Sequence, residues 1–126
     1  MSTTPRRFAI LHHTGYGREH WDLLLEQDET LFTWQLGSCP ASDQNFPIDA
    51  ARIADHRKIY LDYEGPVSGA RGHVTAVDRG KLTMISQDPQ RIEFELEGES
   101  VAGRFVLTQV SESVWRLAQP SSSQYG

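Results

Sequence analysis

The stretch HWDLLLEQDETLFTWQL (20–36) decides the fold class. Its first half, HWDLLLEQ (20–27), alternates between a face of large apolar residues and a face that carries polar groups, as an extended chain requires. Its second half, TLFTWQL (30–36), is rich in strand-forming residues and follows the short polar turn Asp28-Glu29. The stretch therefore predicts an antiparallel β-hairpin. The apolar face of its first strand comprises Trp21, Leu23 and Leu25.

Short apolar runs between frequent turn residues continue this β pattern along the chain. In RIEFELE (91–97), apolar residues alternate with glutamates, which predicts one core face and one solvent face. Loops are expected at 37–50 and 66–72, and a short helical turn or an irregular segment at 50–56. Strands are expected at 7–13, 20–27, 30–36, 57–65, 73–80, 81–86, 91–98, 103–110 and 113–119. About eight or nine strands on one core predict an all-β, mostly antiparallel small barrel, or a compact sandwich, with little helix.

Length and composition set the class of protein. The 126 residues fit one domain, 1–126, with an ordered core over about 7–118 and a flexible tail over 119–126. A lone cysteine, Cys39, excludes an internal disulfide and suits a reducing compartment. We find no run of about 18 apolar residues and no secretory leader. We therefore expect a soluble, cytoplasmic protein that does not contact a membrane.

The net charge of −5 argues against a generic, charge-driven grip on duplex nucleic acid. It leaves room for a small basic pocket that holds one phosphate or one strand end. The cationic residues of the first two thirds of the chain could form such a pocket. They are Arg6, Arg7, Arg18, Arg57, Lys58, Arg71, Arg79 and Lys81.

A histidine and an aspartate share the polar face of the first hairpin strand. His20 and Asp22 are two residues apart, and the preceding predicted strand ends in His12 and His13. The short loop between the two strands can bring one of these histidines beside the pair. Two imidazoles and a carboxylate can bind a divalent metal such as Mn or Zn and leave positions open for water or phosphate.

A second polar cluster lies in DHRKIYLDYEG (55–65). His56 and Tyr60 could hydrogen-bond a phosphate, or His56 could act as a general acid. The glycine-containing loop after this segment offers backbone N–H groups and Arg71, which suit an anion. The sequence contains no P-loop, no dinucleotide fingerprint and no nucleophile motif around Cys39 or a serine.

Taken in order, ILHHTGYGREHWDLLLE (10–26), LFTWQL (31–36) and DHRKIYLDYEGPVSGARG (55–72) resemble the 3′-phosphoesterase domain of bacterial DNA ligase D. That enzyme acts in nonhomologous end joining, and the domain also occurs as stand-alone proteins. VDRG (77–80) and LEGESVAGRFVL (96–107) are similar to its later strands.

The resemblance implies a small β-barrel that uses Mn²⁺ to remove a 3′-phosphate or a 3′-terminal ribonucleotide from a DNA primer end. Zn²⁺ or another divalent metal is the alternative cofactor. DNA or RNA–DNA 3′ ends would be its substrates, and a separate ligase or polymerase its partner. The implied metal ligands are His13 (with His12 as the less favoured choice), His20 and Asp22, and the groups at the scissile phosphate are His56 and Tyr60.

One departure from the family pattern concerns phosphate binding. Where the family has an arginine two residues beyond the metal-binding aspartate, this chain has Leu24. An aliphatic side chain supplies neither the charge nor the paired hydrogen bonds of guanidinium. We expect Arg71, or with less support Lys58 or Arg18, to supply the missing charge. The second hypothesis is a non-catalytic module that keeps the barrel, and with it the metal site, and binds a nucleic-acid end or a repair protein.

Overall fold

The computed structural model describes residues 5–42 and 45–120, and the architecture is all-β. A single 3₁₀-helical turn, η2 (Lys58–Leu61), is described between strands β4 and β5. The strands are β1 (Arg6–Thr14), β2 (His20–Gln27), β3 (Thr30–Leu36), β4 (Ile48–His56), β5 (Gly65–Pro66), β6 (His73–Asp88), β7 (Arg91–Glu97), β8 (Ala102–Gln109) and β9 (Trp115–Ala118). Residues 121–126 of the predicted tail lie outside the described residues.

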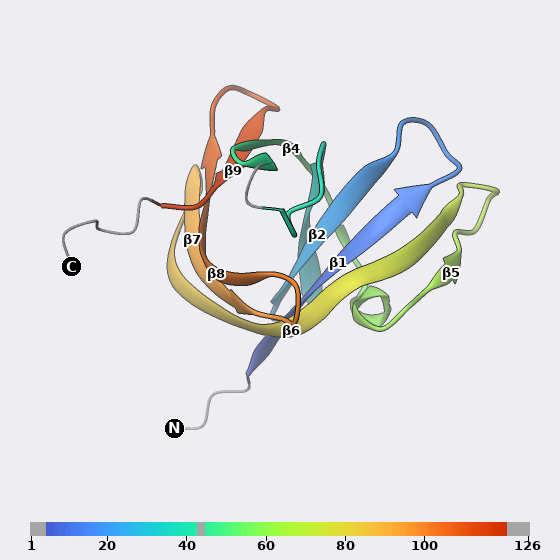
Figure 1. Cartoon of the computed structure of the whole chain (residues 1–126), viewed down its shortest axis with the longest axis horizontal. Coiled ribbons are helices and arrows are strands. Elements are labelled where there is room, and N and C mark those ends of the chain that lie inside the picture. Colours follow the sequence, from blue (N-terminus) through green and yellow to red (C-terminus); the bar gives the residue numbers. More distant parts are fainter. Residues whose placement is uncertain (1–4, 43–44, 121–126) are drawn as a thin grey trace.

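The strands form one sheet that closes on itself (Figure 1). Its order is β1-β2-β3-β4-β9-β8-β7-β6-β5, and an additional pairing of β1 with β6 joins the two sides. Every pairing is antiparallel. The closed antiparallel barrel of eight strands predicted from the sequence is thereby confirmed, with β5 as a short addition beside β6.

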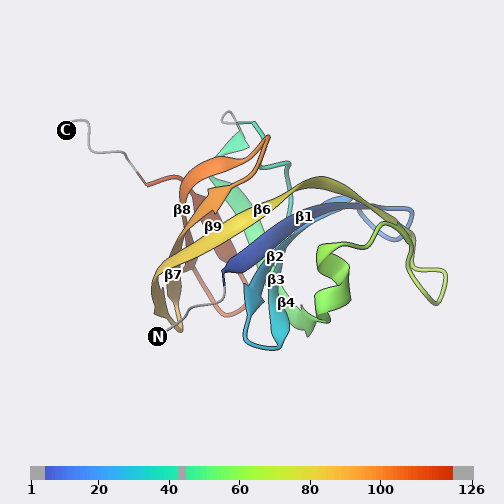
Figure 2. The same cartoon turned by 90° about the horizontal axis from the view of Figure 1, so that it is seen from below.

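Strand β6 allows the barrel to close. It pairs with β1 through its first part and with β7 through its last part, and Figure 2 shows it crossing the length of the molecule. Register shifts occur between Ile10 and Leu11 of the β1 pairing and between Met84 and Ser86 of the β7 pairing. Such irregularities bend a strand, so one segment can serve both halves of the barrel.

Two apolar clusters lie on opposite sides of the β1–β3 wall. The larger one fills the barrel and includes Trp34, Phe94 and Trp115. The smaller one lies outside this wall, where η2 covers it. Since the inner cluster takes Phe8 and Ile10 and the outer one takes Ala9 and Leu11, β1 is buried on both faces. The outer cluster comprises Ala9, Leu11, Leu24, Leu31, Leu61 and Val74, with Tyr60, Tyr63, Val67 and Ala76 packed against it.

Two sequence predictions about the middle of the chain are wrong. Residues 50–56, expected to be a helical turn or irregular, belong to β4, which pairs with β3 and β9. Pairing on both edges outweighs the weak strand propensity of its alanines. Residues 57–65, expected to be a strand, contain η2, because Tyr60 N–H donates to the Arg57 carbonyl and Asp62 N–H to the Ile59 carbonyl.

The burial of 57–65 does not follow the period of two that a strand with one buried face gives. The adjacent residues Tyr60 and Leu61 both contribute to the outer cluster, whereas Ile59 is 56% exposed.

The strands expected at 73–80 and 81–86 form the single strand β6. Gly80, which resembles a strand breaker in the sequence, lies where a Cβ atom would be 2.1 Å from the Glu97 carbonyl oxygen. Glycine therefore permits close packing at this point and does not end the strand. Within the described ranges, no helix is long and apolar enough to cross a membrane.

Candidate metal centre and phosphate site

The predicted metal ligands meet on the outer surface of the barrel, at the loop that joins β1 to β2. His13 and His20 are directly opposite each other in the β1–β2 ladder, and Asp22 lies two residues further along β2 on the same face. One ligand atom from each of the three side chains lies within 4.8 Å of the others. Antiparallel pairing therefore brings His13 beside His20 and Asp22, the pair that the sequence placed on one strand face.

His13 is oriented by a backbone carbonyl. Its Nε2 lies 2.7 Å from the carbonyl oxygen of Arg71. A carbonyl oxygen only accepts, so Nε2 must carry the proton and Nδ1 is left with its lone pair. Nδ1 is the nitrogen that faces the carboxylate of Asp22, at 3.8 Å from Oδ2.

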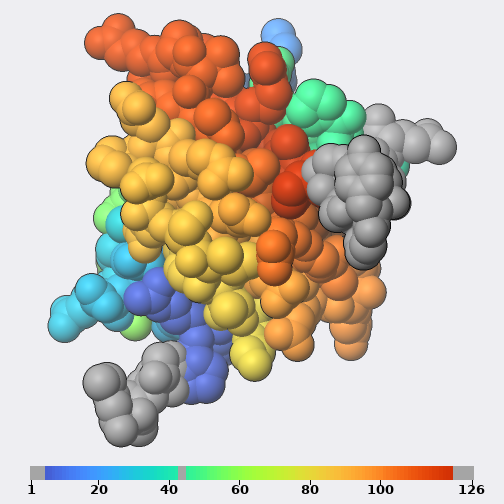
Figure 3. Space-filling view, turned by 90° about the vertical axis from the view of Figure 1, so that its left-hand side faces the viewer, coloured from blue at the N-terminus to red at the C-terminus, as the bar shows by residue number. Residues whose placement is uncertain are grey.

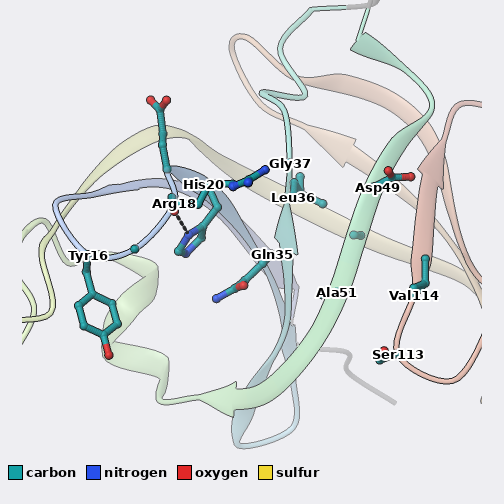
Figure 4. Close-up of a pocket in the computed structure, with 13 residues that line it drawn as sticks. Tyr16, Arg18, His20, Gln35, Leu36, Gly37, Asp49, Ala51, Ser113 and Val114 are labelled. Atoms are coloured by element: carbon teal, nitrogen blue, oxygen red, sulfur yellow. Dashed lines mark hydrogen bonds between the residues drawn. The ribbon is translucent and has the colours of Figure 1, made fainter.

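His20 is oriented in the same way by its other nitrogen. Its Nδ1 lies 3.0 Å from the carbonyl oxygen of Arg18, as the dashed line in Figure 4 shows. Its Nε2 therefore faces Asp22, 3.2 Å from Oδ1. Contact with the Asp22 carboxylate raises the pKa of His20 above its ordinary value, while partial burial of the ring opposes this rise.

The facing atoms of His20 and Asp22 are short of partners. Nε2 of His20 and Oδ1 of Asp22 are buried, and neither completes a well-aligned hydrogen bond with the described residues. Asp22 itself is only 4% exposed. Each histidine is held by a backbone carbonyl through one ring nitrogen and turns the lone pair of the other toward a buried carboxylate. Metal-binding histidines adopt this arrangement. The residues present therefore fit a divalent metal such as Mn²⁺ or Zn²⁺.

Gly72 keeps the loop of Arg71 close to His13. Its φ angle is +86°, and a Cβ atom there would lie 2.2 Å from the carbonyl oxygen of Thr14. Only glycine adopts this conformation without strain and permits such a close approach. The loop 66–72 can therefore reach the end of β1 and present the Arg71 carbonyl to the His13 ring.

His12, the alternative ligand considered from the sequence, points to the other side of β1. Its ring stacks on Trp21, with ring centroids 4.9 Å apart, and its Nε2 contacts the carboxylate of Glu19. Successive residues of a strand face opposite ways. The structure thus brings His13, and not His12, to His20 and Asp22.

His56 and Tyr60 lie together in a row of rings outside the barrel. The ring centroids of His56 and Tyr60, and those of Tyr60 and Tyr63, are each 5.5 Å apart. Tyr60 packs on the outer cluster, which adjoins the metal ligands through β2. His56 lies opposite Leu31 of β3, four residues along that strand from the level of Asp22. The structure therefore joins His56 to Tyr60 and places the metal ligands further along the same surface.

Leu24 occupies the position between these two groups. It follows Asp22 on the same face of β2, is fully buried and belongs to the outer cluster. The aliphatic side chain is therefore part of a packed apolar layer beneath η2. This packing explains how the barrel accommodates leucine where the family pattern has arginine.

The three cations considered as replacements for that arginine lie in different settings. Arg71 is beside His13, but its guanidinium Nε donates to the Ser68 carbonyl oxygen at 2.8 Å. Lys58 pairs with Glu26 at 3.3 Å. Arg18 flanks His20 in the β1–β2 loop. Arg71 and Arg18 are thus the two of these cations whose own backbone carbonyls contact the candidate ligands His13 and His20.

A surface cavity of about 630 Å³ opens beside His20 and extends over β3 and β4 (Figure 4). Gln35 lies on the same face as its cross-strand partner Asp22, and its amide projects to the same side as the His20 ring. The sequence analysis missed this residue. The alternation of β3 could have placed it there, since the pattern TLFTWQL puts one polar side chain at the metal end. The far wall of the cavity includes Asp49, Ala51, Ser113 and Val114.

Comparison with known proteins agrees with this geometry. Residues 11–109 match the family model of the DNA Ligase D 3′-phosphoesterase domain. A curated relative is the "Multifunctional non-homologous end joining protein LigD" of Pseudomonas aeruginosa (strain PAO1), which is 29% identical over 135 aligned residues. The alignment covers 98% of this chain and 16% of that protein, so the chain spans about one sixth of the relative's length. The matched region holds all three metal-ligand candidates, the three residues of the ring row and Arg71. The chain belongs to the DNA ligase D 3′-phosphoesterase domain family.

Proposed function

We propose that this protein is a metal-dependent phosphoesterase that acts on 3′-phosphate or 3′-ribonucleotide ends of DNA during end repair. Membership of the phosphoesterase family supports the reaction class. One observation carries the metal dependence. Both histidines use one ring nitrogen on a backbone carbonyl and turn the other toward the buried carboxylate of Asp22. A cation between these groups would satisfy two buried polar atoms, His20 Nε2 and Asp22 Oδ1, which face each other at 3.2 Å without a well-aligned hydrogen bond.

His13, His20 and Asp22 would hold the metal, with Mn²⁺ as the proposed cofactor. A bound divalent cation polarises a phosphoryl oxygen and lowers the pKa of a coordinated water. The Arg71 and Arg18 carbonyls keep the two imidazoles in the tautomers that binding requires. The near-complete burial of Asp22 limits competition from bulk water for its carboxylate.

The remaining residues would act on the phosphate ester. Water attacks phosphorus, the bond from phosphorus to the 3′-oxygen breaks, and His56 gives that oxygen a proton. The Tyr60 hydroxyl donates a hydrogen bond to a phosphoryl oxygen, and Arg71 supplies positive charge in place of the family arginine. The cavity beside His20 has room for the terminal nucleotide of the substrate.

Release of inorganic phosphate from a 3′-phosphorylated DNA primer tests the proposal. We expect turnover with Mn²⁺, none with chelator, and a loss of at least about 100-fold in His20→Ala. His12→Ala is the matched control, because it removes a histidine from the other side of the same wall. A labelled primer with a single 3′-ribonucleotide tests the second substrate by shortening of the labelled strand, because cleavage of the same bond releases a ribonucleoside 5′-monophosphate and no inorganic phosphate. Equal turnover in His20→Ala and in wild type would reject the metal site.

The second candidate is a binding module without turnover. The burial of Leu24 favours it, because the position of the phosphate-binding arginine is closed by apolar packing. In that case the protein would bind Mn²⁺ at His13, His20 and Asp22 but would hydrolyse neither the 3′-phosphate nor the 3′-ribonucleotide end. Isothermal titration calorimetry with Mn²⁺, run on the same preparation as the phosphate-release assay, separates the two functions, because a binding module would bind the metal without releasing product.

Two further assignments remain predictions. A separate ligase or polymerase would use the 3′-hydroxyl that hydrolysis leaves, and its extension or sealing of treated ends is the test. We also propose that the protein is cytoplasmic, and fractionation of cells that express it would check this location.

A further inference from the structure

Three cations crowd one patch of the outer surface, at the end of β1 away from the metal ligands. Arg7 of β1 and Lys81 of β6 are directly opposite each other in the ladder. Arg79 lies two residues before Lys81 on the same strand and pairs with Ala9. Like charges directly opposite each other destabilise a sheet. The space-filling view shows the start of β1 beside the middle of β6 at the surface (Figure 3).

Nearby carboxylates balance this patch weakly. Arg7 donates to both carboxylate oxygens of Asp62, at 3.4 and 3.1 Å, but the two side chains are 49% and 68% exposed. Lys81 is 4.0 Å from Glu97, and both are more than half exposed. Ion pairs this exposed contribute little and are screened by salt. The cations can therefore exchange these partners for another anion.

Arg79 has no carboxylate partner among the described residues. Its Nε donates to the carbonyl oxygen of Leu61 at 2.6 Å, which fixes the guanidinium against the end of η2. Its Nη2 is buried and makes no hydrogen bond with the described part of the chain. A guanidinium that is held in place but has unused donors is suited to bind an oxyanion.

The patch is hollowed. A cavity of about 380 Å³ is lined by four cations and by no acidic residue. The chain as a whole has 17 acidic and 12 basic residues, so this concentration of positive charge runs against the overall composition. Local rules of charge pairing are most often broken at functional sites. The lining residues are Pro5, Arg6, Arg7, Phe8, Leu61, Arg79, Gly80 and Lys81.

The patch and the metal ligands share a face of β1. Arg7 and His13 are six residues apart and both face outward, a distance of roughly 20 Å at 3.3 Å per residue. A nucleic-acid strand carries one phosphate per roughly 3.4 Å of helix axis. Ala9 and Leu11, between the two, are buried in the layer that η2 covers, so a strand whose 3′ end lies at the metal ligands would pass around η2 and reach the patch at least about six nucleotides upstream.

We propose that Arg7, Arg79 and Lys81 form a second anion site that binds backbone phosphates of a nucleic-acid strand, several nucleotides from its 3′ end. The anion site follows from the charges and the cavity alone. Its assignment to nucleic acid rests on the proposed function. Backbone contacts of this kind add affinity and register without reading sequence.

Fluorescence anisotropy with a labelled primer–template that ends in a 3′-hydroxyl, in chelator, tests the site. Without metal or a scissile phosphate, the readout does not depend on turnover. We expect Arg7→Gln with Lys81→Gln to lower affinity about tenfold and to reduce the salt dependence by about two phosphate contacts. The control is the double variant Arg91→Gln with Arg104→Gln. It removes two exposed cations, one on β7 and one on β8, that both pair with Glu93.

An equal loss of affinity in both double variants would show that only the net charge of the protein matters, and this would overturn the site. No loss of affinity in either double variant would also overturn it. A third titration uses inorganic phosphate alone and follows the amide signals of β6 by NMR. The nucleic-acid assignment would be overturned if inorganic phosphate shifts the amide signals of residues 79–81 while the double variant of the patch binds the oligonucleotide as tightly as wild type does. If the patch governs binding but the phosphatase assay is negative, the proposed function fails and the anion site remains.

Discussion

Nε2 of His13 lies 2.7 Å from the carbonyl oxygen of Arg71, although the two residues are 58 positions apart in the chain. This contact joins the backbone of loop 66–72 to the candidate metal centre. It fixes the imidazole with Nδ1 toward Asp22. The loop thus has two separable roles. Its carbonyl orients the proposed ligand His13, and the Arg71 side chain, which donates to the Ser68 carbonyl oxygen, carries the charge proposed to bind phosphate.

Replacing His13 by alanine should weaken Mn²⁺ binding by at least about tenfold, because one of three converging ligands is lost. His12→Ala is the matched control and should bind Mn²⁺ as wild type does, since His12 contacts Glu19 and Trp21. Isothermal titration calorimetry at pH 7.5 measures both. The reverse ranking would make His12 the ligand, the alternative that the sequence left open.

Replacing Arg71 by alanine should separate the two roles of its loop. The backbone carbonyl remains, so we expect Mn²⁺ affinity to stay within about twofold of wild type. The charge is lost, so phosphate release should fall by at least about tenfold. Unchanged turnover would reject Arg71 as the substitute for the family arginine. Arg71→Lys, which restores the charge without the planar fork, should recover part of the activity.

Restoring the family arginine in Leu24→Arg should destabilise the protein by at least about 3 kcal/mol, because it places an unpaired charge in the layer beneath η2. Leu24→Met, of similar volume, should cost less than about 1.5 kcal/mol. Urea unfolding followed by tryptophan fluorescence provides both values. If Leu24→Arg is as stable as wild type and hydrolyses the primer end faster, the layer opens readily and the arginine site is latent.

Asp78 should stabilise the barrel in a pH-dependent way. Burial alone would raise the pKa of this carboxyl. The backbone N–H groups of Glu99, Val101, Ser100 and Arg79 outweigh burial and lower the pKa below its ordinary value. A folded-state pKa below the unfolded value of about 3.9 means that this stabilisation is full above that pH and is lost as the pH falls through the folded-state pKa.

Asp78→Asn should therefore cost about 2 kcal/mol or more at pH 7, and the gap to wild type should close below about pH 4. Urea unfolding at pH 7 and near pH 3 measures the gap. Asp88→Asn, an exposed change at the end of the same strand, is the control. An equal gap at both pH values would show that shape, and not charge, is what Asp78 contributes.

The sequence predicted best where local pattern and tertiary structure coincide. The hairpin of β2 and β3 formed with the predicted bounds, because alternation and a polar turn specify it locally. The same alternation placed His20 and Asp22 on one face, and the short loop after β1 limited the choice of a third ligand to two histidines. These groups were predictable since they are neighbours in a ladder.

Prediction failed where a segment takes its conformation from distant parts of the chain. Residues 50–56 became a strand mainly through pairing with β3, and Lys58–Leu61 formed η2, which covers the outer cluster. Neither partner lies within the window that a propensity pattern reads. For the same reason, the local pattern of β2 alone predicted a polar outer face and gave no sign of the apolar layer that covers Leu24.

The sequence by itself predicted the all-β class and grouped His20 and Asp22 with one of two adjacent histidines, because strand alternation and the chemistry of histidine and aspartate are local properties. Tertiary structure alone decided which of two adjacent histidines joins the set, which ring nitrogen it presents and where three cations gather. These outcomes depend on contacts such as that of His13 with the Arg71 carbonyl and on the pairing of Arg7 with Lys81, which join residues more than 50 positions apart. Such contacts arise only when the barrel closes through β1 and β6.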